Sequence, residues 1–289
     1  MIYFYRHKRL NEFSQEEIDM LGYDGVSKFA KEHGLHPDKV FAEVKALEKQ
    51  IEQTKTEILD PSLPNVKKLL DKSVSEYIDF FNKNANYKKQ AYVVIGNIGS
   101  GKSTYADMIE EDTHSIIIDS DRFRTGENTK NGFFEGFSSL YSPEDNQKIQ
   151  ISCTLASAIA SEKIAQTGMN IIIPTAPNSE EYLDKKIKAL IENNYDIHLI
   201  FIDAPYPELA NRTYFRYLVK EYEQELDPNG NLMRGRFAPL SIIKSFGDPC
   251  FDTFAKTYHK KRFKSYQAFY NDQNTNGNEA IDLKTMQYW

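Results

Sequence analysis

Apolar residues after position 90 gather in short runs, and longer segments with helical spacing separate these runs. The runs read AYVVI, HSIIID, NIIIP, DIHLIFID and SYQAFY, at 91–95, 114–119, 170–174, 196–203 and 265–270. Continuous apolar runs of this length are typical of strands that are buried on both faces of a parallel sheet. Helical spacing occupies 102–112, 143–167, 179–193 and 207–226. The alternation predicts a three-layer α/β/α domain with a mostly parallel sheet.

The first 88 residues follow a different pattern, with helical spacing and no strand-like run. Three segments show it: 14–21, 38–58 and 65–84. Ser14 and Glu17 form a capping-box pattern, and Pro37 with Asp38 can begin the second of these helices. We therefore predict a small all-α region over 1–88, followed by the α/β domain over 89–289.

Composition narrows the class of protein. The 289 residues include 36 Lys and Arg against 42 Asp and Glu, a formal charge of −6, which argues against a general nucleic-acid binder. Cys153 and Cys250 are too few for a disulfide framework or a cysteine metal cluster. No apolar run approaches the roughly 20 residues of a membrane span. We expect a cytoplasmic protein with no membrane or nucleic-acid partner.

A glycine-rich turn follows the first apolar run and precedes a predicted helix. It reads GNIGSGKS and matches the phosphate-loop (P-loop) pattern G-x-x-x-x-G-K-[ST]. Backbone N–H groups of such a loop point at phosphate oxygens, Lys102 can reach the β and γ phosphates, and the Ser103 hydroxyl can bind Mg²⁺. The predicted binding residues for ATP or GTP are Gly96, Asn97, Ile98, Gly99, Ser100, Gly101, Lys102, Ser103 and Thr104.

Two carboxylates follow the second apolar run. Asp119 and Asp121 should lie at the carboxyl edge of the sheet, where ligands bind in such folds. Asp121 can accept the proton of an acceptor hydroxyl or help to hold the metal, and Asp119 can contact substrate if the strand continues through it. The alternative is that one of the two only caps the next turn.

Arginines come from the later part of the chain. Arg212 and Arg216 are four residues apart on one predicted helix, and Arg236 follows in a loop. Guanidinium groups stabilise the negative charge of a phosphoryl group in transfer. We predict that Arg216 and Arg236 have this role. Arg212 is a candidate substrate contact, with an ion pair to Glu208 as the alternative.

In this order, the motifs resemble those of the zeta toxin family of P-loop kinases, which phosphorylate UDP-N-acetylglucosamine and so block bacterial wall synthesis. The resemblance runs from about Ala91 to Tyr270 and rests on GNIGSGKS, DSDRF and RFAP. It implies that Asp121 is the catalytic base and that Arg216, counted from Pro205, and Arg236 clamp the phosphates. Lys102 completes the implied catalytic set.

The sequence departs from the family's pattern at the end of the third run. Pro174 stands where the family usually has a glutamate that contacts the sugar nucleotide. Either Thr175 or a nearby acid replaces that contact, or the substrate differs. Aromatic residues between 126 and 141 could stack on a substrate ring, although such residues more often pack under a loop.

The resemblance also implies a partner, because a small helical antitoxin neutralises the family's toxins. The helical residues 1–88 could be a fused antitoxin that acts in cis, or an accessory bundle. We predict a Mg²⁺-dependent kinase that moves the γ-phosphate of ATP or GTP to a hydroxyl of a small, nucleotide-linked metabolite. The alternatives are a nucleic-acid 5′-hydroxyl kinase and a nucleotide-binding regulator that has lost catalysis.

Overall fold

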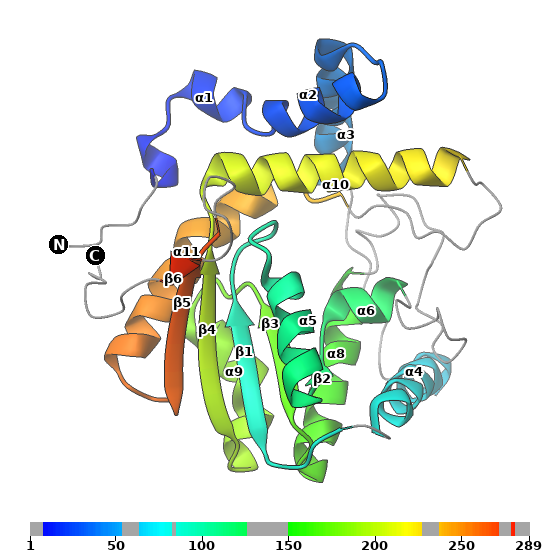
Figure 1. The fold of residues 1–289 in the computed structure, drawn as a ribbon. Helices are drawn as coiled ribbons and strands as arrows, with labels where there is room; N and C mark the ends of the chain where they lie inside the picture. The colour runs from blue at the N-terminus through cyan, green and yellow to red at the C-terminus, as the bar shows by residue number, and fades with distance from the viewer. Residues whose placement is uncertain are drawn as a thin grey trace.

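The computed structural model describes residues 8–53, 64–82, 85–125, 150–226, 237–271 and 279–280. Its centre is a sheet with the strand order β2-β3-β1-β4-β5-β6 (Figure 1). Neighbouring strands are parallel except for β5 and β6, which pair antiparallel. The strands are β1 Gln90–Ile95, β2 Ile116–Ile117, β3 Ile171–Thr175, β4 Asp196–Asp203, β5 Ser265–Tyr270 and β6 Glu279–Ala280.

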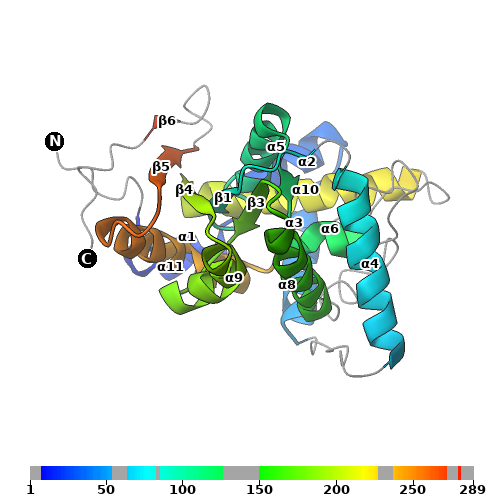
Figure 2. The same ribbon diagram turned by 90° about the horizontal axis from the view of Figure 1, so that it is seen from below.

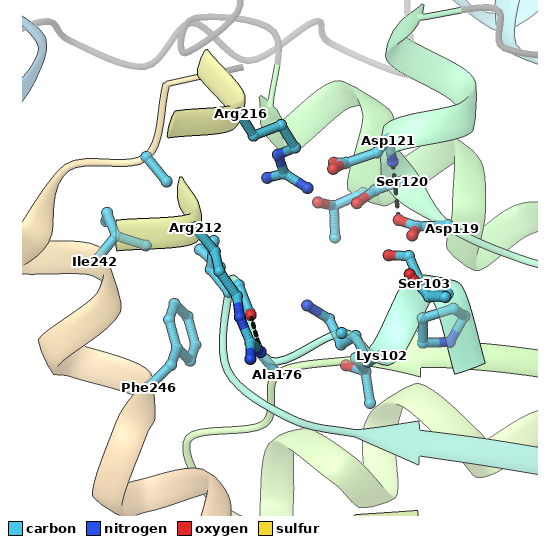
Figure 3. Close-up of a pocket in the computed structure, with 18 of the residues that line it drawn as sticks. Lys102, Ser103, Asp119, Ser120, Asp121, Ala176, Arg212, Arg216, Ile242 and Phe246 are labelled. Atoms are coloured by element: carbon cyan, nitrogen blue, oxygen red, sulfur yellow. Dashed lines mark hydrogen bonds between the residues drawn. The ribbon is translucent and has the colours of Figure 1, made fainter. Parts of the chain in front are cut away.

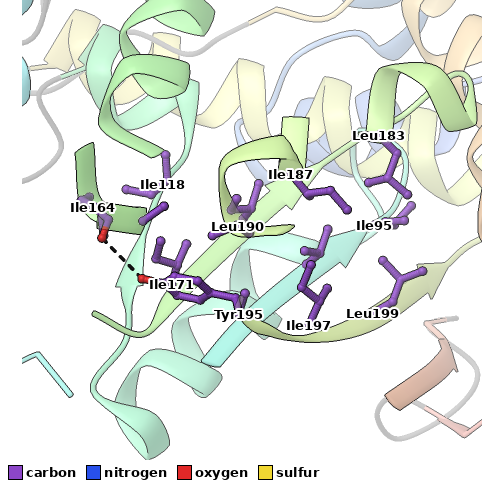
Figure 4. Packing of buried hydrophobic residues seen from close by; sticks show 14 of the residues in the cluster. Ile95, Ile118, Ile164, Ile171, Leu183, Ile187, Leu190, Tyr195, Ile197 and Leu199 are labelled. Carbon is purple, nitrogen blue, oxygen red and sulfur yellow. Dashed lines mark hydrogen bonds between the residues drawn. The ribbon is translucent and has the colours of Figure 1, made fainter. Parts of the chain in front are cut away.

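Helices cover both faces of this sheet, as the alternation of elements predicts (Figure 2). On one face, Val94 and Ile172 pack against Ala106 of α5. On the other face, Ile171 and Leu199 pack against α8, α9 and α11, and Figure 4 shows the α9 side chains of this layer. The three-layer α/β/α prediction is confirmed. The helices are α5 Lys102–Thr113, α6 Ser120–Thr125, α8 Gln150–Thr167, α9 Glu180–Glu192, α10 Tyr206–Leu226 and α11 Leu240–His259.

The helices of the N-terminal region pack in two separate places. Helices α2 (Tyr23–Glu32) and α3 (Pro37–Gln53) pack on each other, and α2 lies against α10. Helix α4 (Pro64–Asn82) packs on α8 and contributes Tyr77 to the main core of the sheet. The predicted capping box at Ser14 is present before α1 (Gln15–Asp19). The division at residue 88 stays a prediction. Although α4 precedes residue 88, it packs with the α/β domain and not with α2 and α3.

Helix α11 occupies a segment where the sequence predicts no helix. Gly247, Asp248 and Pro249 in its middle are typical of a turn. The Tyr206 hydroxyl inserts at this point and accepts a hydrogen bond from the Asp248 amide at 3.1 Å. A Cβ on Gly247 would overlap that hydroxyl, so the glycine allows the insertion. A long-range contact therefore overrides the local turn signal.

None of the helices in the described ranges is both long and apolar enough to cross a membrane.

Candidate active site

The P-loop connects β1 to α5 in a tight curl, as its sequence pattern predicts. The Gly96 amide donates to the Thr175 carbonyl at 3.1 Å, and the Ser100 amide donates to Asn97 at 3.2 Å. A Cβ on Gly96 would lie 2.6 Å from the Ile202 carbonyl oxygen, which only glycine avoids. Gly101 precedes α5 with a φ of 95°, in the left-handed region. This backbone leaves the amino end of α5 open toward a ligand.

Residues far away in the sequence hold the loop in this shape. The Asn97 side chain donates to the Ile243 carbonyl at 2.7 Å. The Asn271 side chain donates to the Ser100 carbonyl at 2.8 Å. The Arg212 guanidinium donates to the Gly99 carbonyl at 3.4 Å and to the Asn271 carbonyl at 3.2 Å. The loop is therefore braced from β5, α10 and α11.

These contacts bear on the prediction that Arg212 binds substrate. Arg212 lines the cavity, but its guanidinium holds the P-loop and lies 3.9 Å from Glu208, the alternative partner expected from the sequence. A substrate contact by Arg212 stays a prediction. The hydrogen bonds that the structure describes for Arg212 hold the P-loop and Asn271 in place.

Lys102 faces the centre of the cavity. Its Nζ donates to the Asn97 carbonyl at 3.3 Å. Burial lowers the pKa of Lys102, the negative charges of Asp119 and Asp121 oppose that shift, and the positive charge of Arg216 adds to it. The charges of Asp119, Asp121 and Arg216 therefore all influence the Lys102 ammonium, and all four residues line the same cavity.

The two aspartates come together in a different way from the one expected. Strand β2 ends at Ile117, so Asp119 and Asp121 are not alternate residues of one strand. The Asp119 carboxylate accepts the Asp121 amide at 3.0 Å, and the chain turns there into α6. The capping alternative thus holds for Asp119, and Asp121 lies in the first turn of α6. Burial and the charge of Asp121 raise the pKa of Asp119.

A cavity of about 560 Å³ joins these groups. Figure 3 shows Lys102, Asp121 and Arg216 from three elements pointing into it. The cavity is the space in which a triphosphate on the P-loop could meet an acceptor molecule. The predicted site residues that line it are Ile98, Gly99, Gly101, Lys102, Ser103, Thr104, Asp119, Asp121, Thr175, Arg212 and Arg216.

Other predicted positions lie elsewhere. Gly96, Asn97 and Ser100 shape the loop from behind and are not among the residues that line the cavity. Arg236 and the aromatic residues between 126 and 141 lie outside the described residues. Pro174, where the family's pattern has glutamate, does line the cavity.

Several lining residues have no signal in the motifs. Thr154 of α8, Tyr182 and Lys186 of α9, and Phe246 of α11 reach the cavity. Lys186 could have been noticed, because it interrupts the apolar stripe of Leu183, Ile187 and Leu190 on its helix. Nothing in the sequence around Thr154, Tyr182 and Phe246 sets these residues apart from other helix residues.

The donor atoms in the cavity suit a hard cation. The Ser103 hydroxyl and the carboxylates of Asp119 and Asp121 line one space, and Mg²⁺ prefers oxygen ligands and retains several waters. Within the described ranges no group of three or more His, Cys, Asp or Glu side chains forms a metal cage.

Comparison with known proteins agrees with the geometry. The family model described as Zeta toxin matches residues 75–278. None of the curated proteins matches the chain by sequence.

Solved structures give weaker likenesses. A structure from the PezAT toxin–antitoxin system of Streptococcus pneumoniae has 16% identity and a TM-score of 0.47, covering 77% of this chain and 81% of that one. An AvrRxo1-ORF1:AvrRxo1-ORF2 structure with sulphate ions has 15% identity and a TM-score of 0.48, covering 75% of this chain and 65% of that one. At TM-scores below 0.5 these likenesses decide nothing about the chemistry of this chain.

Proposed function

The chain belongs to the zeta toxin family of P-loop kinases, and from that premise we propose that it transfers the γ-phosphate of ATP or GTP, with Mg²⁺, to a hydroxyl of a small, nucleotide-linked metabolite such as UDP-N-acetylglucosamine. The observation that carries the proposal is the convergence of Lys102, Asp121 and Arg216 on one cavity beside the P-loop. A helical antitoxin is the partner that the family's pattern implies.

Each of these side chains has a part in the transfer. Lys102 and the loop amides hold the β and γ phosphates. The acceptor oxygen attacks the γ-phosphorus, the bond to the β–γ bridging oxygen breaks, and the nucleoside diphosphate leaves. Asp121 takes the hydroxyl proton, and Arg216 stabilises the negative charge that spreads over the transferring oxygens. A bound Mg²⁺, held by Ser103 and the nearby carboxylates, would neutralise charge on the phosphates.

The position of Asp121 supports its role as the base. A base must lie within hydrogen-bond reach of the proton that it accepts, so its orientation matters as much as its charge. The bond from its amide to Asp119 fixes its backbone, and Figure 3 shows its carboxylate facing Arg216. Asp119 therefore positions Asp121 through this hydrogen bond, and it also lines the cavity itself.

An Asp121→Asn variant tests the proposal. We expect phosphoryl transfer to fall by about a hundredfold or more, because a general base contributes on the order of 10²–10⁴, while nucleotide affinity stays within a few-fold. Turnover with labelled ATP and binding of a nucleotide analogue measure the two quantities. The exposed Asp112→Asn on α5 is the matched control. Equal loss of affinity and turnover would instead identify Asp121 as a metal ligand.

The same labelled ATP separates the alternatives when it is given with a pool of sugar nucleotides and a 5′-hydroxyl oligonucleotide. Label on a metabolite supports the proposal. Label on the oligonucleotide end identifies a nucleic-acid kinase. Nucleotide binding without transfer to any acceptor identifies a regulator, an outcome that the absence of the family's glutamate at position 174 permits.

A further inference from the structure

A second lysine enters the active-site cavity from the helical layer opposite α5. Lys186 of α9 lines the cavity together with the hydroxyl-bearing residues Thr154, Thr175 and Tyr182. Helices α8 and α9 pack on the sheet face remote from the P-loop helix. Neither the P-loop nor the arginine helix contributes these side chains. They therefore form a distinct half of the cavity, which we call the acceptor half.

Lys186 differs from the other lysines of its helix in its partners. Lys185 lies 2.8 Å from Glu181, and Lys188 lies 3.7 Å from Glu192, both on the exposed surface. Among the described residues no carboxylate lies within 4.0 Å of the Lys186 ammonium. Its described hydrogen bond is to the Ser157 hydroxyl, at 3.0 Å. An ammonium group has three N–H donors, so two remain for a ligand.

The Ser157 hydroxyl fixes where the ammonium points. Ser157 is fully buried and donates its own proton to the Thr154 carbonyl at 2.8 Å. Its oxygen is therefore left to accept from Lys186. This chain of two bonds holds the long lysine side chain against α8, so part of the entropy cost of ordering it is already met before any ligand arrives.

The electrostatics of this half favour a negatively charged ligand. Burial lowers the pKa of Lys186, and the charge of Asp119 opposes that shift. A desolvated ammonium gains more from an anion than a hydrated one does, because water no longer screens the pair.

We propose that Lys186 binds an anionic group of the acceptor molecule, and that this group is a phosphate. The inference rests on the proposed function and names Lys186 as the residue that holds the phosphate which a nucleotide-linked acceptor carries. Lys186 donates to the phosphate oxygens, and the hydroxyls of Thr154, Thr175 and Tyr182 lie in the same half to complete the contacts.

Calorimetry on the full chain tests the proposal. The P-loop is first saturated with Mg²⁺ and a non-hydrolysable ATP analogue, so that the added phosphate can bind only elsewhere. Glycerol 3-phosphate is then titrated, with glycerol as the uncharged probe. The variants are Lys186→Met, the conservative Lys186→Arg, and Lys185→Met as the matched control on the same helix.

We expect the wild type and Lys185→Met to bind glycerol 3-phosphate equally and to give no signal with glycerol. Lys186→Met should bind it at least about tenfold more weakly, the loss of one charge-assisted hydrogen bond, and Lys186→Arg should recover part of that loss. The affinity for the ATP analogue should be the same in all four proteins, which shows that each is folded.

Either of two results overturns the proposal: no binding of glycerol 3-phosphate by the wild type, or equal binding by Lys186→Met. A Lys186 that only balances the charge of Asp119 would give the second result. Phosphoryl transfer is measured separately, so a protein that binds the phosphate but transfers nothing contradicts the proposed function and leaves this site in place.

Discussion

At the residue scale, the P-loop depends on side chains that its motif does not contain. Asn271 follows the last residue of β5, and it connects the Ser100 carbonyl to the Arg212 guanidinium. Its own amide donates to the Asp203 carbonyl at 2.8 Å, so the end of the sheet fixes its position. The loop is thus held from outside, and its shape does not rest on glycine alone.

Asn271→Ala should weaken nucleotide binding without removing it. The change deletes the bond to Ser100 and one of the contacts to Arg212, at about 0.5–1.5 kcal/mol each, which predicts a dissociation constant for the ATP analogue that is higher by at least about fivefold. Calorimetric titration measures this constant. The exposed Gln267→Ala on the same strand should leave it unchanged. An unaltered constant in Asn271→Ala would show that the loop keeps its shape unaided.

At the element scale, the N-terminal helix α3 is joined to α10 and α11 through one buried carboxylate. Glu48, which is 5% exposed, accepts a hydrogen bond from the Tyr214 hydroxyl of α10 at 2.8 Å. It also accepts the backbone amide of Leu240 at the start of α11, and it pairs with Lys45. Phe237, just before α11, stacks on Tyr214 and lines the cavity. Glu48 therefore fixes the segment that directly follows the predicted catalytic Arg236.

Glu48→Ala should destabilise the protein by about 3 kcal/mol, because it leaves a buried amide and a buried hydroxyl without their partner. For a chain of this size that corresponds to a melting temperature lower by roughly 5–10 °C. Thermal unfolding measures the shift. Glu43→Ala, on the exposed face of α3, should change it by less than about 2 °C. Equal shifts in the two variants would contradict the role of Glu48.

How far the sequence predicts these elements depends on the range of the interactions that form them. The strands and the P-loop follow from local patterns: β4 has the predicted bounds, and Gly96 to Ser103 form the expected curl. Helix α11 was not predicted, and the turn at Asp119 was expected only as the alternative to a continued strand, since a hydroxyl from α10 and a side-chain cap decide them. Lys186 and Asn271 reach the site through tertiary packing, which no motif encodes.

At the scale of the whole molecule, α2 and α3 lie on the side of α10 that faces away from the sheet, above α10 in Figure 1, whereas α4 lies beside α8. Val26, Phe29 and Val44 pack with Tyr214 and Tyr217 of α10. None of the described residues before position 85 lines the cavity. These contacts support an accessory role for α2 and α3. Deletion of all 88 residues would be a poor test, because it would also remove α4 from the main core.

Gly25→Ala tests this role in the intact chain. Gly25 lies where α2 packs against α10, and an added Cβ would lie 2.2 Å from the Asn211 carbonyl oxygen. The methyl group must displace one helix, at about 1–3 kcal/mol. If the N-terminal helices support α10, kinase turnover and melting temperature should both fall, with Lys31→Ala as the exposed control on α2. Turnover above the wild-type rate would instead support inhibition in cis.

Helix α10 carries Arg212, which braces the P-loop, and Arg216, the predicted phosphoryl contact, on its inner side, and α2 packs against its outer side. A compound that bound between α2 and α10 would displace both guanidinium groups together. Because Arg212 braces the P-loop, such a compound would weaken nucleotide binding as well as transfer, without occupying either substrate site. The contact between α2 and α10 is thus a place to look for allosteric inhibitors.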